Sequence, residues 1–101
     1  MEARFTEPSV LILASLAGGP KHGYALIKDI ETIVGATLGP GTLYGALSRL
    51  ERSGLVEALP AEDRRRPYRI TAAGVEAARG YLEHVHGLAS VGLRRLAAGH
   101  A

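Results

Sequence analysis

The feature that most restricts the fold is a long apolar repeat near the C-terminus, from about residue 72 to residue 97. Its apolar and small residues recur at alternating spacings of three and four, as Val75, Ala78, Leu82, Val85, Ala89, Gly92 and Leu96. This heptad spacing predicts one helix with a single apolar seam. A helix of about 26 residues is roughly 39 Å long at 1.5 Å per residue, so it extends beyond the small body formed by the rest of the chain. We therefore expect the seam to pair with a second copy in a two-fold dimer.

Three shorter helices are expected before this repeat. Ser9–Ala17 is nearly all apolar, which predicts a helix buried on most sides, and we expect Leu11 to contribute to the dimer interface. A second helix should run from about residue 22 to 34 and end at Gly35. A third should run from 41 to 53 and end at Gly54.

A hairpin is expected between the third helix and the long one. Leu55–Pro60 and Arg66–Ile70 are rich in strand formers and flank a charged turn. Pro67 indicates an edge strand, and Thr71 is a good N-cap for the long helix. The fold class is therefore mainly α with a small β-hairpin: a winged helix-turn-helix over residues 1–71, followed by a C-terminal dimerisation helix over residues 72–101.

The third helix carries glycines on its outward side, where they do not stabilise a surface helix. Leu43, Leu47 and Leu50 form one apolar stripe, and Gly41 and Gly45 lie on the opposite side. Each glycine costs roughly 1 kcal/mol relative to alanine. A bare backbone lets a helix approach a bulky partner, and the major groove of DNA admits a helix.

Several alternatives stay open for this face. Gly41 could be only a turn residue, and Gly45 could pack against another helix. Tyr44 could pack on the second helix. Arg49 and Arg52 could form ion pairs with Glu51 or Glu31, and the charged hairpin loop could serve only solubility.

Composition excludes several other classes of protein. The chain has 101 residues, no cysteine and a net charge of +2, so it is neither a disulfide scaffold nor a cysteine-type zinc protein. No stretch is long and apolar enough for a membrane span, and we expect a cytoplasmic location. We find no constellation of catalytic side chains, metal ligands or cofactor motifs, so we expect neither an enzyme nor a bound cofactor.

Three linked motifs carry a family resemblance: HGYALI (residues 22–27), GTLYGALSRLERSGLV (41–56) and RRPYRITAAG (65–74). In this order and spacing they resemble the PadR family of transcriptional regulators, in its short form with one C-terminal helix. The resemblance implies that Tyr44 faces the DNA backbone, that the basic hairpin loop reaches a minor groove, and that His22 begins the supporting helix. With the residues above, the expected DNA-binding set is Lys21, His22, Tyr24, Gly41, Thr42, Tyr44, Gly45, Ser48, Arg49, Arg52, Arg64, Arg65 and Arg66.

The expected function is transcriptional repression by a homodimer that binds a palindromic operator in double-stranded DNA. A winged-helix module that binds another protein through the same surface is the alternative. A small apolar effector between the last helices of the dimer is a further possible partner.

Overall fold

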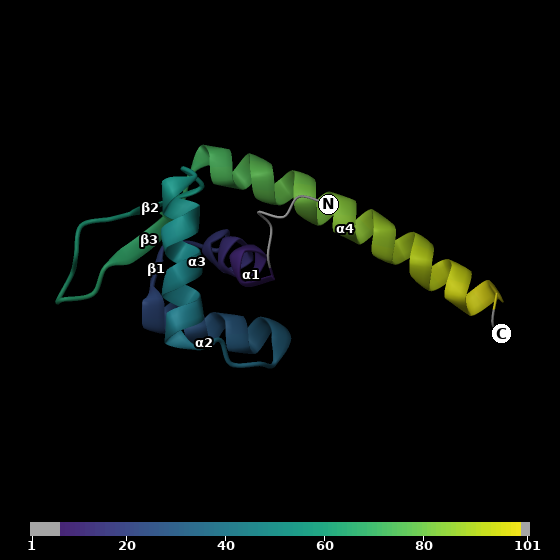
Figure 1. Cartoon of the computed structure of the whole chain (residues 1–101), viewed down its shortest axis with the longest axis horizontal. Coiled ribbons are helices and arrows are strands. Elements are labelled where there is room, and N and C mark those ends of the chain that lie inside the picture. The colour runs from purple at the N-terminus through teal and green to yellow at the C-terminus, as the bar shows by residue number, and fades with distance from the viewer. Residues whose placement is uncertain (1–6, 100–101) are drawn as a thin grey trace.

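The computed structural model describes residues 7–99, and Figure 1 shows a small helical body from which one long helix extends. In chain order the elements are α1 (Glu7–Leu16), β1 (Lys21–His22), α2 (Gly23–Val34), α3 (Pro40–Arg52), β2 (Val56–Ala58), β3 (Pro67–Ile70) and α4 (Ala72–Gly99). The predicted fold class, mainly α with a small β-hairpin and a long C-terminal helix, is confirmed.

The sheet differs from the predicted hairpin because it contains a third strand. Strand β1 pairs with β3 so that His22 lies opposite Pro67, and the strand order is β1-β3-β2 with both pairings antiparallel. The prediction that Pro67 marks an edge strand is wrong, since β3 is central. Proline is tolerated there because it is the first residue of its strand, where its carbonyl accepts a hydrogen bond from the Leu59 N–H at 2.8 Å. A strand of two residues has no hydrophobic period, so the sequence pattern could not reveal β1.

The predicted helix ends are formed by backbone and side-chain caps. Gly35 follows α2 with φ of +73°, and its N–H donates to the Glu31 carbonyl. Gly54 follows α3 with φ of +77°, a conformation that glycine adopts without steric penalty. At the start of α4, the Thr71 hydroxyl accepts a hydrogen bond from the Gly74 N–H at 3.0 Å. These three expectations are confirmed.

The core lies where the first three helices meet the sheet and the first turns of α4. Helix α1 packs against α2, α3, α4 and β3, so it is buried on most sides as predicted. The stripe of Leu43, Leu47 and Leu50 faces inward. The core consists of Ile12, Leu13, Leu16, Leu26, Ile30, Leu43, Ala46, Leu47, Leu50, Val56 and Ala78.

Helix α4 leaves the body after its first turns. Figure 1 shows its C-terminal half running past α1 with no other element beside it, and the molecule measures 55 Å along its longest axis. Leu88, Leu93 and Leu96 are 62%, 68% and 60% exposed. No helix within residues 7–99 is both long enough and apolar enough to cross a lipid bilayer.

Candidate nucleic-acid interface

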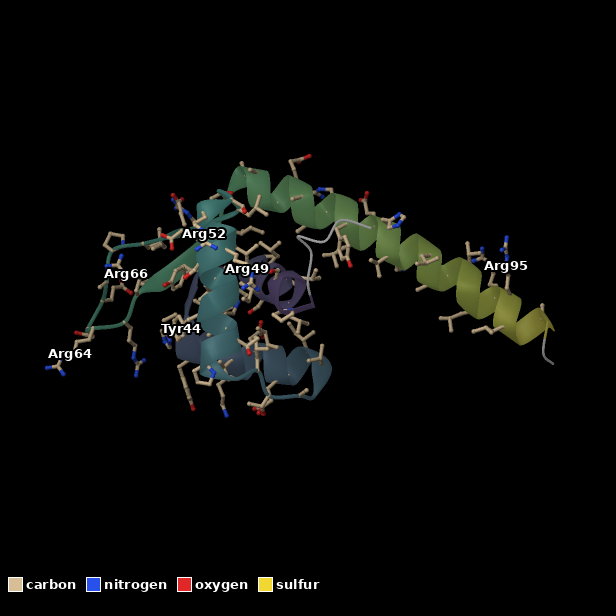
Figure 2. The ribbon with its side chains drawn as sticks, in the orientation of Figure 1. Tyr44, Arg49, Arg52, Arg64, Arg66 and Arg95 are labelled. Carbon is tan, nitrogen blue, oxygen red and sulfur yellow. The ribbon has the colours of Figure 1, made fainter. Side chains whose placement is uncertain are left out.

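Helix α3 presents an outward face that is free of apolar bulk. Its leucine stripe is buried, whereas Thr42, Ser48, Arg49 and Arg52 on the other side are exposed. In Figure 2, α3 stands between the hairpin and the rest of the body, with Tyr44 near its first turns and Arg52 near its last. The residues predicted for the recognition helix therefore share one accessible face.

The two glycines of this face pack against no other element within residues 7–99. A methyl group at Gly41 would meet no atom within 4 Å outside its local helix backbone. At Gly45 it would meet only the end of the Arg49 side chain, at 3.7 Å. Within residues 7–99, Gly45 therefore packs against no other helix. Internal packing does not account for either glycine.

The N-terminus of α3 also has unused hydrogen-bonding capacity. Its N-cap, Gly39, has no side chain that can accept from the first N–H groups, and Pro40 occupies the first helical position. Gly41 and Thr42, which follow, are exposed. Free N–H groups at a helix N-terminus, together with the positive end of the helix dipole, attract phosphate.

Tyr44 lies between α3 and α2. A methyl group at Gly23 would overlap the Tyr44 hydroxyl, so the tyrosine ring rests directly on the α2 backbone. The side chain is nevertheless 48% exposed. Tyr44 thus packs its hydroxyl end on the second helix while much of the residue stays exposed, so packing on α2 and a contact with a partner are compatible.

The two arginines of α3 form no ion pair within residues 7–99. Glu31, one of the acidic partners considered above, instead accepts a hydrogen bond from the Thr37 hydroxyl at 2.7 Å and lies 3.6 Å from the Lys28 ammonium. The Thr37 hydrogen bond, aided by Lys28, holds the pKa of Glu31 below its ordinary value. Arg49 and Arg52 are therefore available to a partner.

The hairpin of β2, β3 and the loop of residues 59–66, called the wing below, ends in a tight charged turn. The backbones of Glu62 and Arg65 exchange hydrogen bonds of 2.7 and 2.8 Å. Asp63 and Arg64 between them have φ of +47° and +68°. This is the pattern of a type I′ turn, which normally uses asparagine and glycine. Figure 2 shows Arg64 at the tip, directed away from the body.

Other arginines of the wing hold the hairpin together. The Arg66 guanidinium donates to the Leu59 carbonyl at 3.0 Å. Arg69 pairs with Glu57, which lies directly opposite it on β2. The Arg66 side chain remains exposed, but its hydrogen bond to the wing backbone sets the position of its guanidinium. The expectation of a hairpin with a charged tip is confirmed.

A pocket of about 290 Å³ lies where the wing meets the first turns of α2 and α3. Three tyrosines (Tyr24, Tyr44 and Tyr68), the three consecutive arginines of the wing, His22 and Gly23 line it. Burial raises the pKa of the Tyr68 hydroxyl above its ordinary value, so this phenol stays neutral and can donate a hydrogen bond. No carboxylate is among these lining residues, so the pocket suits an anion.

Lys21, a member of the expected DNA-binding set, makes its contacts within the chain. Its ammonium group donates to the Ser15 carbonyl at 2.6 Å and lies 3.9 Å from the Asp29 carboxylate. Asp29 in turn accepts from the Ser15 hydroxyl at 2.6 Å. Lys21 therefore joins α1, β1 and α2, and its charge is used within the chain because the loop at 17–20 folds it back onto α1.

Comparison with known proteins supports a family assignment for this arrangement. The model of the transcriptional regulator PadR-like family matches residues 12–80. This chain belongs to the PadR-like family of transcriptional regulators. The match covers all of the elements from β1 to β3 and reaches into α1 and α4 on either side.

Two relatives of the PadR-like chain are longer proteins. An uncharacterized 37.1 kDa protein in transposon TN4556 of Streptomyces fradiae is 49% identical over 73 residues, which are 72% of this chain and 21% of that protein. The transcriptional activator GvpE2 of Halobacterium salinarum is 34% identical over 83 residues, which are 82% of this chain and 39% of that protein. This chain therefore spans less than half the length of either relative.

Solved structures share the fold. A transcriptional regulator from Clostridium thermocellum superposes with a TM-score of 0.75 at 29% identity and covers 86% of this chain and 87% of its own. A PadR family regulator from Clostridium difficile superposes with a TM-score of 0.79 at 22% identity, over 90% of this chain and 99% of its own. The long last helix is thus part of a fold that other regulators share.

The residues expected at a dimer interface divide into two groups in this PadR-like chain. Ala78 belongs to the chain's own core, and Leu11 packs against that core while remaining half-buried. Leu82 and Leu96 are 40% and 60% exposed. Val75 and Val85 are half-buried, and Ala89 is exposed. In the N-terminal part of the predicted seam, apolar residues are thus already partly buried within the chain.

The heptad pattern missed part of the apolar face of α4. Leu88 and Leu93 are more exposed than Leu82 and Leu96 of the predicted seam, and both lie outside its strict spacing of three and four. Counting every apolar residue over residues 85–96, rather than the best heptad alone, would have found them. The exposed apolar face is therefore broader than a coiled-coil seam.

Proposed function

We propose that this PadR-like chain is a homodimeric, DNA-binding transcriptional repressor that recognises a palindromic operator. The observation that carries the proposal is the outward face of α3, where Gly41 and Gly45 have no packing role and exposed arginines follow. Such a face suits insertion into the major groove, which is about 12 Å wide. The same face would serve a protein partner less well, because protein interfaces are centred on bulky apolar anchors.

In the proposed complex, α3 enters the major groove with its N-terminal half closest to the bases. The glycines permit the approach, and the Thr42 and Tyr44 hydroxyls contact phosphates, as do the free N–H groups of the helix. Arg49 and Arg52 extend from the later turns, where they read guanine or hold the backbone.

The wing supports this docking from the side. Arg64 lies at its tip and Arg65 closes the same turn through its backbone pairing with Glu62, and we assign both to phosphates of the flanking turn of DNA. Arg66 contributes charge while it also holds the Leu59 carbonyl. These contacts are expected to raise affinity for every sequence without selecting among bases.

A second copy of the chain is the proposed partner of α4. The exposed leucines of its C-terminal half would be unfavourable in water, and burying each one contributes roughly 1.5–3 kcal/mol. In this proposal residues 1–71 bind DNA and residues 72–101 hold the dimer. Two-fold symmetry then places the half-sites about one helical turn, roughly 34 Å, or a multiple of it, apart.

Fluorescence anisotropy over a salt series tests the proposal. The labelled duplex is the DNA upstream of the chain's own gene, and a scrambled duplex is the control. We expect saturable binding to the first duplex, at least roughly 10³-fold tighter than to the second, with affinity that falls steeply as salt rises. Equal, weak binding to both duplexes would contradict an operator at this position, and retention of a protein partner instead would favour the interaction module.

Replacing Leu96 by glutamate tests the dimer. We expect wild type to sediment as a dimer and this variant to shift toward monomer, because a charge would enter the apolar interface. Leu96 is exposed in the single chain, so the monomer should remain folded. A variant that sediments like wild type would exclude this part of α4 from the interface.

Replacing Arg64 by glycine tests the wing. Glycine adopts φ of +68° without strain, so we expect the free energy of unfolding to rise by up to about 1 kcal/mol. Affinity for any duplex should fall, and the slope of log affinity against log salt should decrease by about one. Arg64→Ala is the matched control, because it removes the same charge but keeps the strain. Unchanged salt slopes in both variants would remove the wing tip from the interface.

Repression is assigned because a dimer bound at a promoter excludes other proteins from the DNA that it covers. The relative GvpE2 is named an activator, so the direction of regulation needs its own measurement. We expect a reporter gene placed behind the operator to be more active when the chain is absent. Lower activity in its absence would reassign the chain as an activator.

A further inference from the structure

The ring of His22 faces two hydrogen-bond donors. His22 is the N-cap of α2, and its Nδ1 accepts from the Ala25 N–H at 3.3 Å. Its Nε2 lies 3.4 Å from Nη1 of Arg65, a residue 43 positions further along the chain. A neutral imidazole has only one nitrogen that can accept a hydrogen bond. The ring therefore cannot satisfy both donors at once.

The lone pair of the His22 ring should accept from the Ala25 N–H rather than from Arg65. Ala25 is half-buried, and its N–H is one of the first donors of α2, which have no partner within the helix. Leaving such a group unpaired is unfavourable. Arg65 is exposed, so water can solvate its guanidinium. The ring should therefore keep Nδ1 bare and carry its proton on Nε2.

With this tautomer, the contact between His22 and Arg65 brings two hydrogen-bond donors together. Arginine is always protonated and has no acceptor, so Nε2–H and Nη1–H both lack an acceptor in their mutual contact. Both residues line the pocket of tyrosines and arginines described above. Both residues also line a second pocket that includes Glu62 and Asp63, but within residues 7–99 neither carboxylate bonds to them. An anionic oxygen of a partner would satisfy both donors.

We propose that the Nε2–H of His22 and the guanidinium of Arg65 together hold one phosphate of the DNA backbone. This inference rests on the proposed function and specifies one contact within it. A capping role alone does not account for a histidine at this position, because asparagine, aspartate and serine are the preferred N-caps. Histidine differs from them in offering a second nitrogen on the far side of the ring.

The first test is the tautomer in the free chain. Long-range ¹H–¹⁵N spectra, recorded at a pH of about 8 where an ordinary histidine is neutral, distinguish the two ring nitrogens. We expect His22 to show a protonated Nε2 and a bare Nδ1. A proton on Nδ1 would mean that Arg65 donates to Nε2 instead, which would overturn the inference without any reference to DNA.

The second test is His22→Asn, which keeps an N-cap but removes the Nε2 donor. We expect the thermal midpoint of the chain to stay at the wild-type value or rise, while affinity for a duplex of arbitrary sequence at low salt falls about tenfold. Wild-type affinity in this variant would overturn the clamp. A duplex of arbitrary sequence is used because a phosphate contact does not depend on the bases.

A double-mutant cycle separates a shared phosphate from general attraction. If His22 and Arg65 bind one phosphate, the losses from His22→Asn and Arg65→Gln should be less than additive when combined. Arg64→Gln is the matched control, since it removes the same charge from the neighbouring residue, and its effect should add to that of His22→Asn. Additive losses in both cycles would overturn the shared contact. If wild type bound no duplex at all, the proposed function and the phosphate contact would fail together, and the tautomer measurement would still stand by itself.

Discussion

Replacing Gly45 by leucine is expected to abolish specific DNA binding while the chain stays folded. Leucine has a higher helix propensity than glycine by almost 1 kcal/mol, and a side chain at this position meets only the mobile end of Arg49. The thermal midpoint should therefore be unchanged or higher. In the groove, the same side chain would hold the α3 backbone away from the bases. We expect affinity for the operator to fall to the level of non-specific binding, roughly 10³-fold or more.

Gly80→Leu is the control for this experiment. Gly80 lies on α4 and also has nothing within 4 Å, on the side of that helix away from the predicted seam, so the substitution adds the same bulk far from α3. It should bind the operator like wild type. Operator binding of wild-type strength by Gly45→Leu, measured by anisotropy, would show that the recognition helix does not approach DNA through this face.

Replacing Gly74 by alanine is expected to destabilise the chain strongly. A methyl group there would overlap the Leu55 carbonyl oxygen and come within 2.7 Å of the Ile70 side chain. That carbonyl also accepts the Thr71 N–H at 3.0 Å, so it cannot move without breaking a hydrogen bond. Overpacking of this kind costs about 2–3 kcal/mol, which corresponds to a fall of roughly 10–20 °C in the thermal midpoint.

Gly80→Ala is the matched substitution in the same helix. It relieves the entropic cost of glycine without meeting another atom, so it should raise stability by up to about 1 kcal/mol. Both midpoints are measured by thermal unfolding at one protein concentration, since dimerisation makes the midpoint depend on concentration. A Gly74→Ala chain as stable as wild type would show that α4 can shift away from the hairpin at little cost.

Local patterns predicted most of the helical architecture. The leucine spacing of α3 identified its buried side, and the glycines at 35 and 54 marked helix ends because they adopt positive φ easily. Thr71 was recognised as a cap from its residue type alone. The same reasoning failed at β1 and at Pro67, because pairing between residues 21–22 and 67–68 is decided by long-range contacts.

The candidate interface was predicted in part. The outward residues of α3 lie on one face, opposite the leucine stripe, as the helical period predicts. The charged tip of the wing is exposed. The charge of Lys21 alone could not show that Ser15 and Asp29 hold its ammonium group. Leu88 and Leu93 were missed because a strict heptad was imposed on a broader apolar face.

By itself the sequence determined which segments are helices, approximately where they end, which face of α3 is buried, and the family resemblance carried by the three motifs. These follow from side-chain period and from caps, which involve residues a few positions apart. The tertiary structure decided which polar groups remain for a partner. Lys21 and Arg66 are committed within the chain, whereas His22 and Arg65 meet across 43 positions. Only folding brings such distant groups together, and their hydrogen-bond partners then determine their chemistry.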